Sequence, residues 1–87
     1  MDNVFAALSD PHRIEIIKRL SSNERAVGEL ANELGRSQPT VSKALRVLRD
    51  AGLVNVRTVG QLRFYSLRRE RLGEVAQWAL GLSRNDQ

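Results

Sequence analysis

The sequence contains no cysteine and only one histidine, and both scarcities limit what the protein can do. Without cysteine there are no disulfides, no thiolate metal ligands and no thiol nucleophile. The single histidine, His12, is not part of a recognisable Ser/His/Asp catalytic set, and no glycine-rich phosphate-binding loop is present. We therefore expect neither an enzyme nor a cofactor or metal site.

Long apolar runs are also missing. No stretch of 18 or more apolar residues occurs, and the first residues do not resemble a signal peptide. The sequence therefore predicts a cytoplasmic protein that does not bind membranes. A chain of 87 residues suits one domain. At this length only about 60–65% of the unfolded surface becomes buried, so a partner subunit is common.

Positive charge is concentrated in the middle of the chain. The net charge is +4, but residues 36–71 hold nine Lys or Arg and two Asp or Glu, which gives +7. The flanking segments, 1–35 and 72–87, have net charges of −2 and −1. So basic a block repels itself unless solvent or an anionic partner screens it. Arginines scattered over a solvated surface are one interpretation. A membrane would need a long basic amphipathic segment, which is absent, so nucleic acid is favoured.

Residues 37–54 are the most informative segment. Ser37 is a suitable helix N-cap, and Pro39 falls in the first turn, where a missing N–H costs little. Apolar residues then recur at the spacing of one helical face: Val41, Ala44, Leu45 and Leu48. The opposite face has polar and basic side chains: Ser42, Lys43, Arg46 and, on its flank, Thr40. Gly52 suits the position after the helix end. This pattern predicts a recognition helix that enters the major groove of DNA.

Three shorter helices are expected before the recognition helix. The first, at residues 2–8, has a short apolar stripe, and Asp10 with Pro11 starts the second. The third lies at about 28–34 and ends at Gly35. Two short helices joined by a tight turn containing glycine predict a helix-turn-helix, here at about residues 28–51.

A β-hairpin is expected at about residues 53–67, with its turn at Gly60 and Gln61. After a helix-turn-helix such a hairpin is a wing, whose tip reaches phosphates or the minor groove. A hairpin that only covers the core is the alternative. Polar and basic residues near the tip favour DNA contact: Arg57, Gln61 and Arg63. The predicted fold class is mainly α with a small β-hairpin (α+β). It is a winged helix-turn-helix with about five helices and a two- or three-stranded wing, whose third strand lies at 25–27.

The last helix, at about residues 69–82, is more apolar than one core requires. Its apolar arc spans about 200°, whereas a helix packed on a single core needs a stripe of little more than about 100°. The surplus, above all Trp78, requires a second surface, most simply another copy of the chain. The alternative is that Trp78 folds back on its own domain. The residues expected at a homodimer interface are Val4, Phe5, Leu8, Leu72, Val75, Trp78, Ala79 and Leu82.

Three phrases of the sequence resemble the ArsR/SmtB family of winged-helix repressors, and together they extend over nearly the whole chain. They are ALSDPHRIEIIKRL, VGELANELGRSQPTVSKALRVLRDAGLV and GQLRFYSL, of which the second is the most specific. The resemblance implies a dimeric DNA-binding repressor of bacteria or archaea that pairs through its first and last helices. It also implies base contacts from the start and front of the recognition helix: Ser37, Gln38, Thr40, Ser42, Lys43 and Arg46.

Many members of the family sense metals, and the residues that they use are missing here. One site type places cysteines in the third helix, where this chain has residues 29–33, ELANE. Another uses Asp and His on the last helix, where this chain has Glu74 and Gln77 but no histidine. Because zinc-type ions require imidazole or thiolate, we expect no regulatory metal. His12 is expected to be a solvated surface residue. The family often has histidine where this chain has Ala44.

The expected function is therefore that of a sequence-specific, DNA-binding transcription regulator. A homodimer would place two recognition helices in successive major grooves, about 34 Å apart, and cover an inverted-repeat operator. Similar members without metal cysteines include some that repress their own operon. Alternatives are a winged-helix module that binds proteins and a nonspecific DNA binder of the nucleoid type. The sequence leaves open the operator, the regulated genes, the direction of regulation and any inducer.

Overall fold

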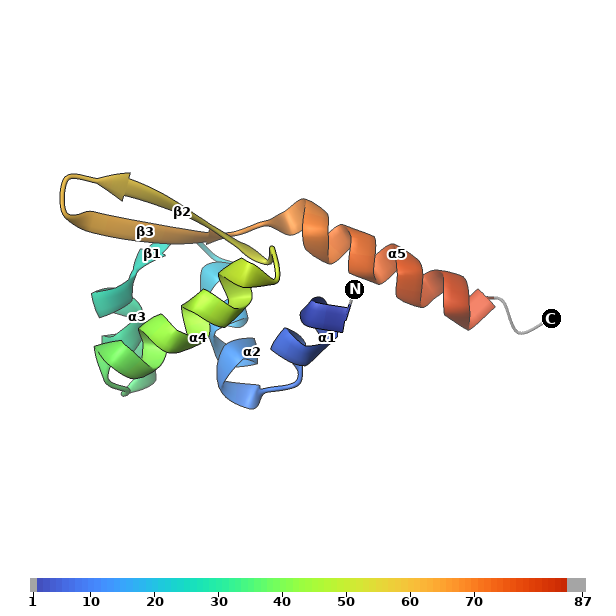
Figure 1. Cartoon of the computed structure of the whole chain (residues 1–87), viewed down its shortest axis with the longest axis horizontal. Coiled ribbons are helices and arrows are strands. Elements are labelled where there is room, and N and C mark those ends of the chain that lie inside the picture. The colour runs from blue at the N-terminus through green and yellow to red at the C-terminus, as the bar shows by residue number, and fades with distance from the viewer. Residues whose placement is uncertain (1, 85–87) are drawn as a thin grey trace.

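The computed structural model describes residues 2–84, and its elements follow one another in the predicted order (Figure 1). The helices are α1 (Asp2–Leu8), α2 (Pro11–Leu20), α3 (Val27–Leu34), α4 (Gln38–Asp50) and α5 (Arg69–Arg84). The strands are β1 (Arg25–Ala26), β2 (Val54–Val59) and β3 (Leu62–Leu67). Helices α3 and α4 form the helix-turn-helix and the strands form the wing, so the predicted fold class is confirmed.

Helix ends lie where local chemistry satisfies free backbone groups. The Asp10 carboxylate accepts the Arg13 N–H at 3.1 Å and caps α2, while the Ser37 hydroxyl accepts the Thr40 N–H at 3.3 Å and caps α4. Gly52 follows α4 with a φ of 76°, a left-handed conformation that glycine adopts without steric cost. Its N–H donates to the Arg49 carbonyl at 2.9 Å, and the chain then turns into β2. The predicted ends of these helices are confirmed.

One face of α4 forms the centre of the hydrophobic core. Val41, Leu45 and Leu48 are fully buried and Ala44 is nearly so, as the periodicity predicted. Burial of a Val or Leu side chain stabilises a fold by about 1.5–3 kcal/mol, so this face anchors the helix firmly. The opposite face of α4 is therefore held outward. Helices α1, α2 and α3 pack around the buried face, and the C-terminal part of α5 extends beyond them (Figure 1).

The sheet has the strand order β1-β3-β2 and is antiparallel throughout. Thr58 of β2 lies opposite Arg63 of β3, and Arg57 lies opposite Phe64. Because successive side chains of a strand point to opposite faces, Arg63 and the buried Tyr65 share the face toward the helices. Arg57 and Phe64 share the outer face. The register therefore separates two arginines that the sequence analysis had assigned to one tip.

Candidate nucleic-acid interface

The exposed face of α4 presents the side chains that the sequence predicted. Ser42, Lys43 and Arg46 are exposed, while the residues between them are buried in the core. Ser37 and Thr40 are exposed as well, but their hydroxyls are engaged with each other. Ser37 Oγ donates to Thr40 Oγ1 at 2.8 Å while it caps the helix. The amide of Gln38 and the groups of Ser42, Lys43 and Arg46 are therefore the more available ones on this helix.

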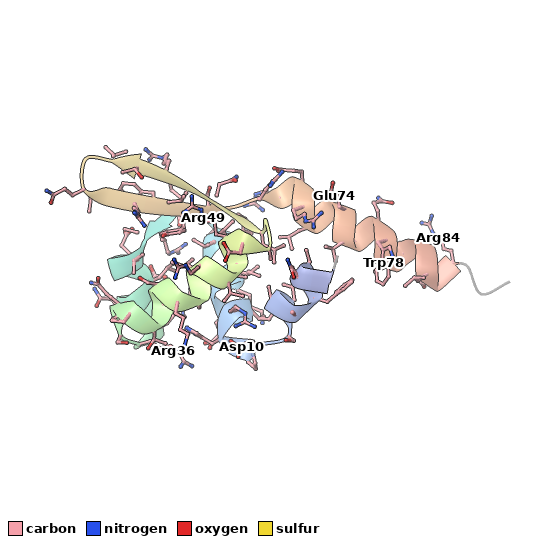
Figure 2. The ribbon with its side chains drawn as sticks, in the orientation of Figure 1. Asp10, Arg36, Arg49, Glu74, Trp78 and Arg84 are labelled. Atoms are coloured by element: carbon pink, nitrogen blue, oxygen red, sulfur yellow. The ribbon has the colours of Figure 1, made fainter. Side chains whose placement is uncertain are left out.

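A cleft of about 640 Å³ separates α4 from the wing. It is lined by Val27 of α3, by Tyr65 and Arg63 of β3, and by five residues of α4: Ser42, Lys43, Arg46, Arg49 and Asp50. Four cationic side chains thus face one concave surface that contains a single carboxylate. Figure 2 shows Arg49 on α4 near the strands of the wing.

Arg49 was not among the predicted site residues. A signal for it was present in the sequence, because it follows Arg46 by three residues and therefore lies on the same helical face. Its partner across the cleft, Arg63, was predicted. The two residues line one cleft only because the wing packs against the helix-turn-helix, which no local pattern indicates.

The cations of the cleft differ from most others in their surroundings. Seven arginines elsewhere form salt bridges: Arg13, Arg19, Arg25, Arg36, Arg57, Arg68 and Arg71. Within residues 2–84, none of the four cations in the cleft forms a salt bridge. Neighbouring positive charges without counter-ions attract an anion with closely spaced charges, such as the DNA backbone.

Arg57 is placed differently from the prediction. It lies in the middle of β2 on the outer face, where its guanidinium forms a salt bridge with Glu24 at 2.5 Å and lies 5.0 Å from the ring centre of Phe64. The hydrogen bond from Arg57 lowers the pKa of the Glu24 carboxyl below its usual value. Arg57 is exposed as predicted, but it lies within β2 rather than at the turn of the hairpin, and Glu24 already pairs with it. Strand alternation places Arg57 on the face of the sheet opposite Arg63. Contact between Arg57 and DNA stays a prediction.

A second concave surface, of about 570 Å³, connects the wing tip with the start of α4. Gln61 and Arg63 of the wing line it together with Gln38 and Ser42 of α4, and the first turns of α3 form the remaining side. Gln61 was predicted near the tip and lies in the turn between β2 and β3. The structure thus brings the wing tip and the beginning of the recognition helix to one surface.

His12 is not the solvated surface residue that the sequence analysis expected. It lies at the start of α2 against the recognition helix, in a small hollow with Thr40, Lys43, Ala44 and Val47. Both ring nitrogens are buried and have no hydrogen-bond partner among the described residues. The imidazole therefore serves as a packing group that seats α4 on α2, which the helical pattern around it did not indicate.

The last helix has a large apolar surface. No residue of α5 is fully buried, although Leu72 and Val75 pack partly against the core. Trp78, labelled on α5 in Figure 2, is 47% exposed. The centre of its ring lies 5.0 Å from the centre of the Phe5 ring in α1. The alternative in which Trp78 folds back on its own domain is thus realised in part. Phe5, Leu80 and Leu82 remain 38%, 46% and 57% exposed and extend the apolar face.

The other residues predicted for the interface differ in how exposed their side chains are. Ala79 is exposed on α5, whereas Leu8 of α1 is half-buried against the core. Val4 was also expected at the interface, but it is fully buried in the core of its own protomer. The prediction for Val4 is wrong, because the stripe of α1 faces α2 and α4 and leaves Phe5 on the outer side.

Within the part of the chain that the structure describes, no helix is long and apolar enough to span a bilayer. No three side chains of His, Asp or Glu gather there in a way that could hold a metal ion.

A helix-turn-helix with unpaired cations on its second helix, flanked by a hairpin, defines the class of winged helix-turn-helix DNA-binding regulators. Residues 10–56 match the family model described as bacterial regulatory protein, arsR family. The chain belongs to this family, so the resemblance seen in the sequence is confirmed.

Similar proteins cover most of the chain. The transcriptional repressor SdpR of Bacillus subtilis is 34% identical over 80 residues, which are 92% of this chain and 89% of SdpR. The transcriptional activator HlyU of Vibrio cholerae is 43% identical over 64 residues, which are 74% of this chain and 59% of HlyU. The crystal structure of the ArsR family regulator RHA00566 has a TM-score of 0.86 at 28% identity, and the match covers 94% of this chain and 90% of that one. Regulators with opposite effects on transcription are thus among the similar proteins.

Proposed function

We propose that the protein is a homodimeric repressor that binds an inverted repeat in double-stranded DNA and blocks access to a promoter. The observation that supports this most directly is the cleft between α4 and β3. Four cations gather there without salt bridges, while seven arginines elsewhere are paired. If these cations served only to keep the protein soluble, they would not have to lack counter-ions.

Each half of the dimer would place α4 in a major groove, with the wing beside it. Arg46 or Lys43 suits guanine and Gln38 suits adenine, because their donors and acceptors match those base edges. Arg49 and Arg63, on opposite walls of the cleft, suit phosphates of the intervening backbone. Affinity should then fall steeply with salt, since each neutralised phosphate releases counter-ions.

The apolar face of α1 and α5 supports a symmetric dimer. Helices α1 and α5 lie at the end of the molecule away from the wing (Figure 1), and they expose the apolar side chains of Phe5, Trp78, Leu80 and Leu82. Pairing of this surface with itself would bury it and present two recognition helices about 34 Å apart on one face of the duplex. SdpR and the biofilm growth-associated repressor of Xylella fastidiosa, similar proteins whose names state repression, support that direction of regulation.

Selection of bound duplexes from a random DNA pool tests this proposal. We expect an inverted repeat whose half-sites are centred about 10 base pairs apart, since one helical turn separates the two major grooves. Binding without a consensus would instead indicate a nonspecific DNA binder. Failure to retain any duplex at low salt would contradict DNA binding and favour a module that binds proteins.

The direction of regulation requires a separate measurement. The selected duplex is placed across a promoter that drives a reporter gene in a bacterial host. Expression of the protein should lower reporter output, and the variant Arg46→Ala should restore it. A rise in output with the wild-type protein would identify an activator.

A further inference from the structure

We propose that Gly28 is a positioning residue for base recognition, because it provides the surface on which the Gln38 carboxamide rests. The inference depends on the proposed function, since it concerns how the same helix-turn-helix discriminates between DNA sequences. Gly28 is the second residue of α3, and Gln38 is the first residue of α4. Both line the concave surface of about 570 Å³ between the helices and the wing tip.

The absence of a side chain on Gly28 leaves room beside the Gln38 carboxamide. A Cβ atom built on Gly28 would lie 3.4 Å from Nε2 of Gln38, the lower limit of ordinary van der Waals contact. The carboxamide of Gln38 therefore lies beside α3, at the position toward which a side chain on Gly28 would point. A side chain longer than that of alanine would compete with the carboxamide for this space.

The backbone gives no other reason for a glycine at this position. Gly35, Gly52 and Gly60 have positive φ values, but Gly28 does not, and it lies within a regular helix. Glycine in a helix costs stability relative to alanine. What glycine adds at this position is space, and the Gln38 side chain occupies that space.

The carboxamide of Gln38 is also chemically available. It forms no side-chain hydrogen bond with any residue between 2 and 84. Glu29 lines the same concave surface as Gln38, but its carboxylate accepts the N–H of Ala26 at 2.8 Å rather than a hydrogen bond from Gln38. A carboxamide confined on one side, with its donors and acceptor free, is suited to bidentate pairing with adenine. Confinement lowers the cost of ordering a flexible side chain when the base is bound.

A graded series at Gly28 tests the proposal. Affinities of Gly28→Ala and Gly28→Leu are measured on a duplex with the selected inverted repeat and on a scrambled duplex of equal composition. Alanine should change neither affinity by more than about twofold, because its Cβ fits at contact distance. Leucine should weaken binding to the selected duplex about tenfold, because one bidentate contact is lost. The affinity for the scrambled duplex should stay unchanged.

The same change is then made in a Gln38→Ala background. If Gly28 acts through Gln38, Gly28→Leu should cause no further loss there, whereas an independent effect would add to it. Equal loss with and without Gln38, equal loss on both duplexes, or wild-type affinity in Gln38→Ala would overturn the inference and leave the proposed function intact. A wild-type protein that binds no duplex would contradict both the inference and the proposed function. Melting curves check folding, and Gly28→Gln replaces Gly28→Leu if the leucine variant is unfolded.

Discussion

Helices α4 and α5 are the two longest helices of the molecule, and they expose different kinds of surface. Helix α4 has 13 residues, of which four apolar ones are buried, and its outer face is basic. Helix α5 has 16 residues, none of them fully buried, and its exposed side chains include Trp78, Leu80 and Leu82. The first helix is thus anchored by the core and offers charge, whereas the second is weakly anchored and offers apolar area.

The charges near the two helices differ in the same way. At the start of α5, Arg71 pairs with Glu74 and Arg68 pairs with Glu70, so these arginines are locally neutralised. The cations that α4 contributes to the cleft have no such partners among residues 2–84. The arginines beside α5 thus have local counter-ions and those of the cleft do not, although the two kinds look alike in the sequence.

The difference in anchoring predicts the largest effect. Leu45→Ala on α4 should lower the free energy of unfolding by about 2–5 kcal/mol, because it leaves a cavity in the core. Leu80→Ala on α5, a matched change at an exposed site, should cost less than about 0.5 kcal/mol in the monomer. Urea denaturation at high dilution measures both values. Equal losses would show that α5 is anchored as firmly as α4.

The apolar face of α5 predicts an effect on assembly. Trp78→Glu should convert the dimer into a monomer, because it places a charge in the middle of a surface that would otherwise be buried. Light scattering measures the mass, and Gln77→Glu, an exposed position on the polar side of the same helix, is the control. Loss of the second half-site should lower affinity for the inverted repeat by about 100-fold or more. A wild-type protein that is already a monomer would contradict this interpretation of α5.

The counter-ion difference predicts a smaller effect on DNA binding. Arg46→Ala should weaken binding to the selected duplex by about 1–3 kcal/mol if the guanidinium contacts a base edge. A loss that is equal on scrambled DNA would indicate phosphate contact only. Arg57→Ala removes the same charge from the outer face of the wing, where Glu24 already neutralises it, and should leave affinity nearly unchanged. Electrophoretic titration compares the two, and similar losses would argue against the unpaired cleft as the DNA surface.

The smallest predicted effect concerns His12, which packs between α2 and α4. His12→Leu should raise the free energy of unfolding by about 1 kcal/mol, because it replaces two buried nitrogens without partners by apolar atoms of similar volume. Lys18→Leu, an exposed position on the same helix, serves as the control and should give no such gain. Thermal denaturation of both variants measures the difference. A less stable His12→Leu protein would indicate that the imidazole makes a polar contact in solution.

Much of the fold could be predicted because its signals are local. The spacing of Val41, Leu45 and Leu48 indicated the buried face of α4, and Ser37 and Gly52 indicated its ends. The errors involve contacts between distant elements. The sequence showed the alternating pattern of the hairpin but not its register, so it did not show that Arg57 and Arg63 lie on opposite faces of the sheet. It showed the stripe of α1 but not that Val4 would be enclosed by other helices.

The chain by itself determined the helix-turn-helix, the wing and the basic face of the recognition helix, because periodicity, capping and charge depend on neighbouring residues. Only the tertiary structure decided which cations lack counter-ions, that Arg49 and Arg63 share one cleft, and that Gly28 lies beneath Gln38. Those relations arise when elements far apart in the chain pack together. The approach of two such side chains is set by strand register and helix packing rather than by any spacing along the sequence.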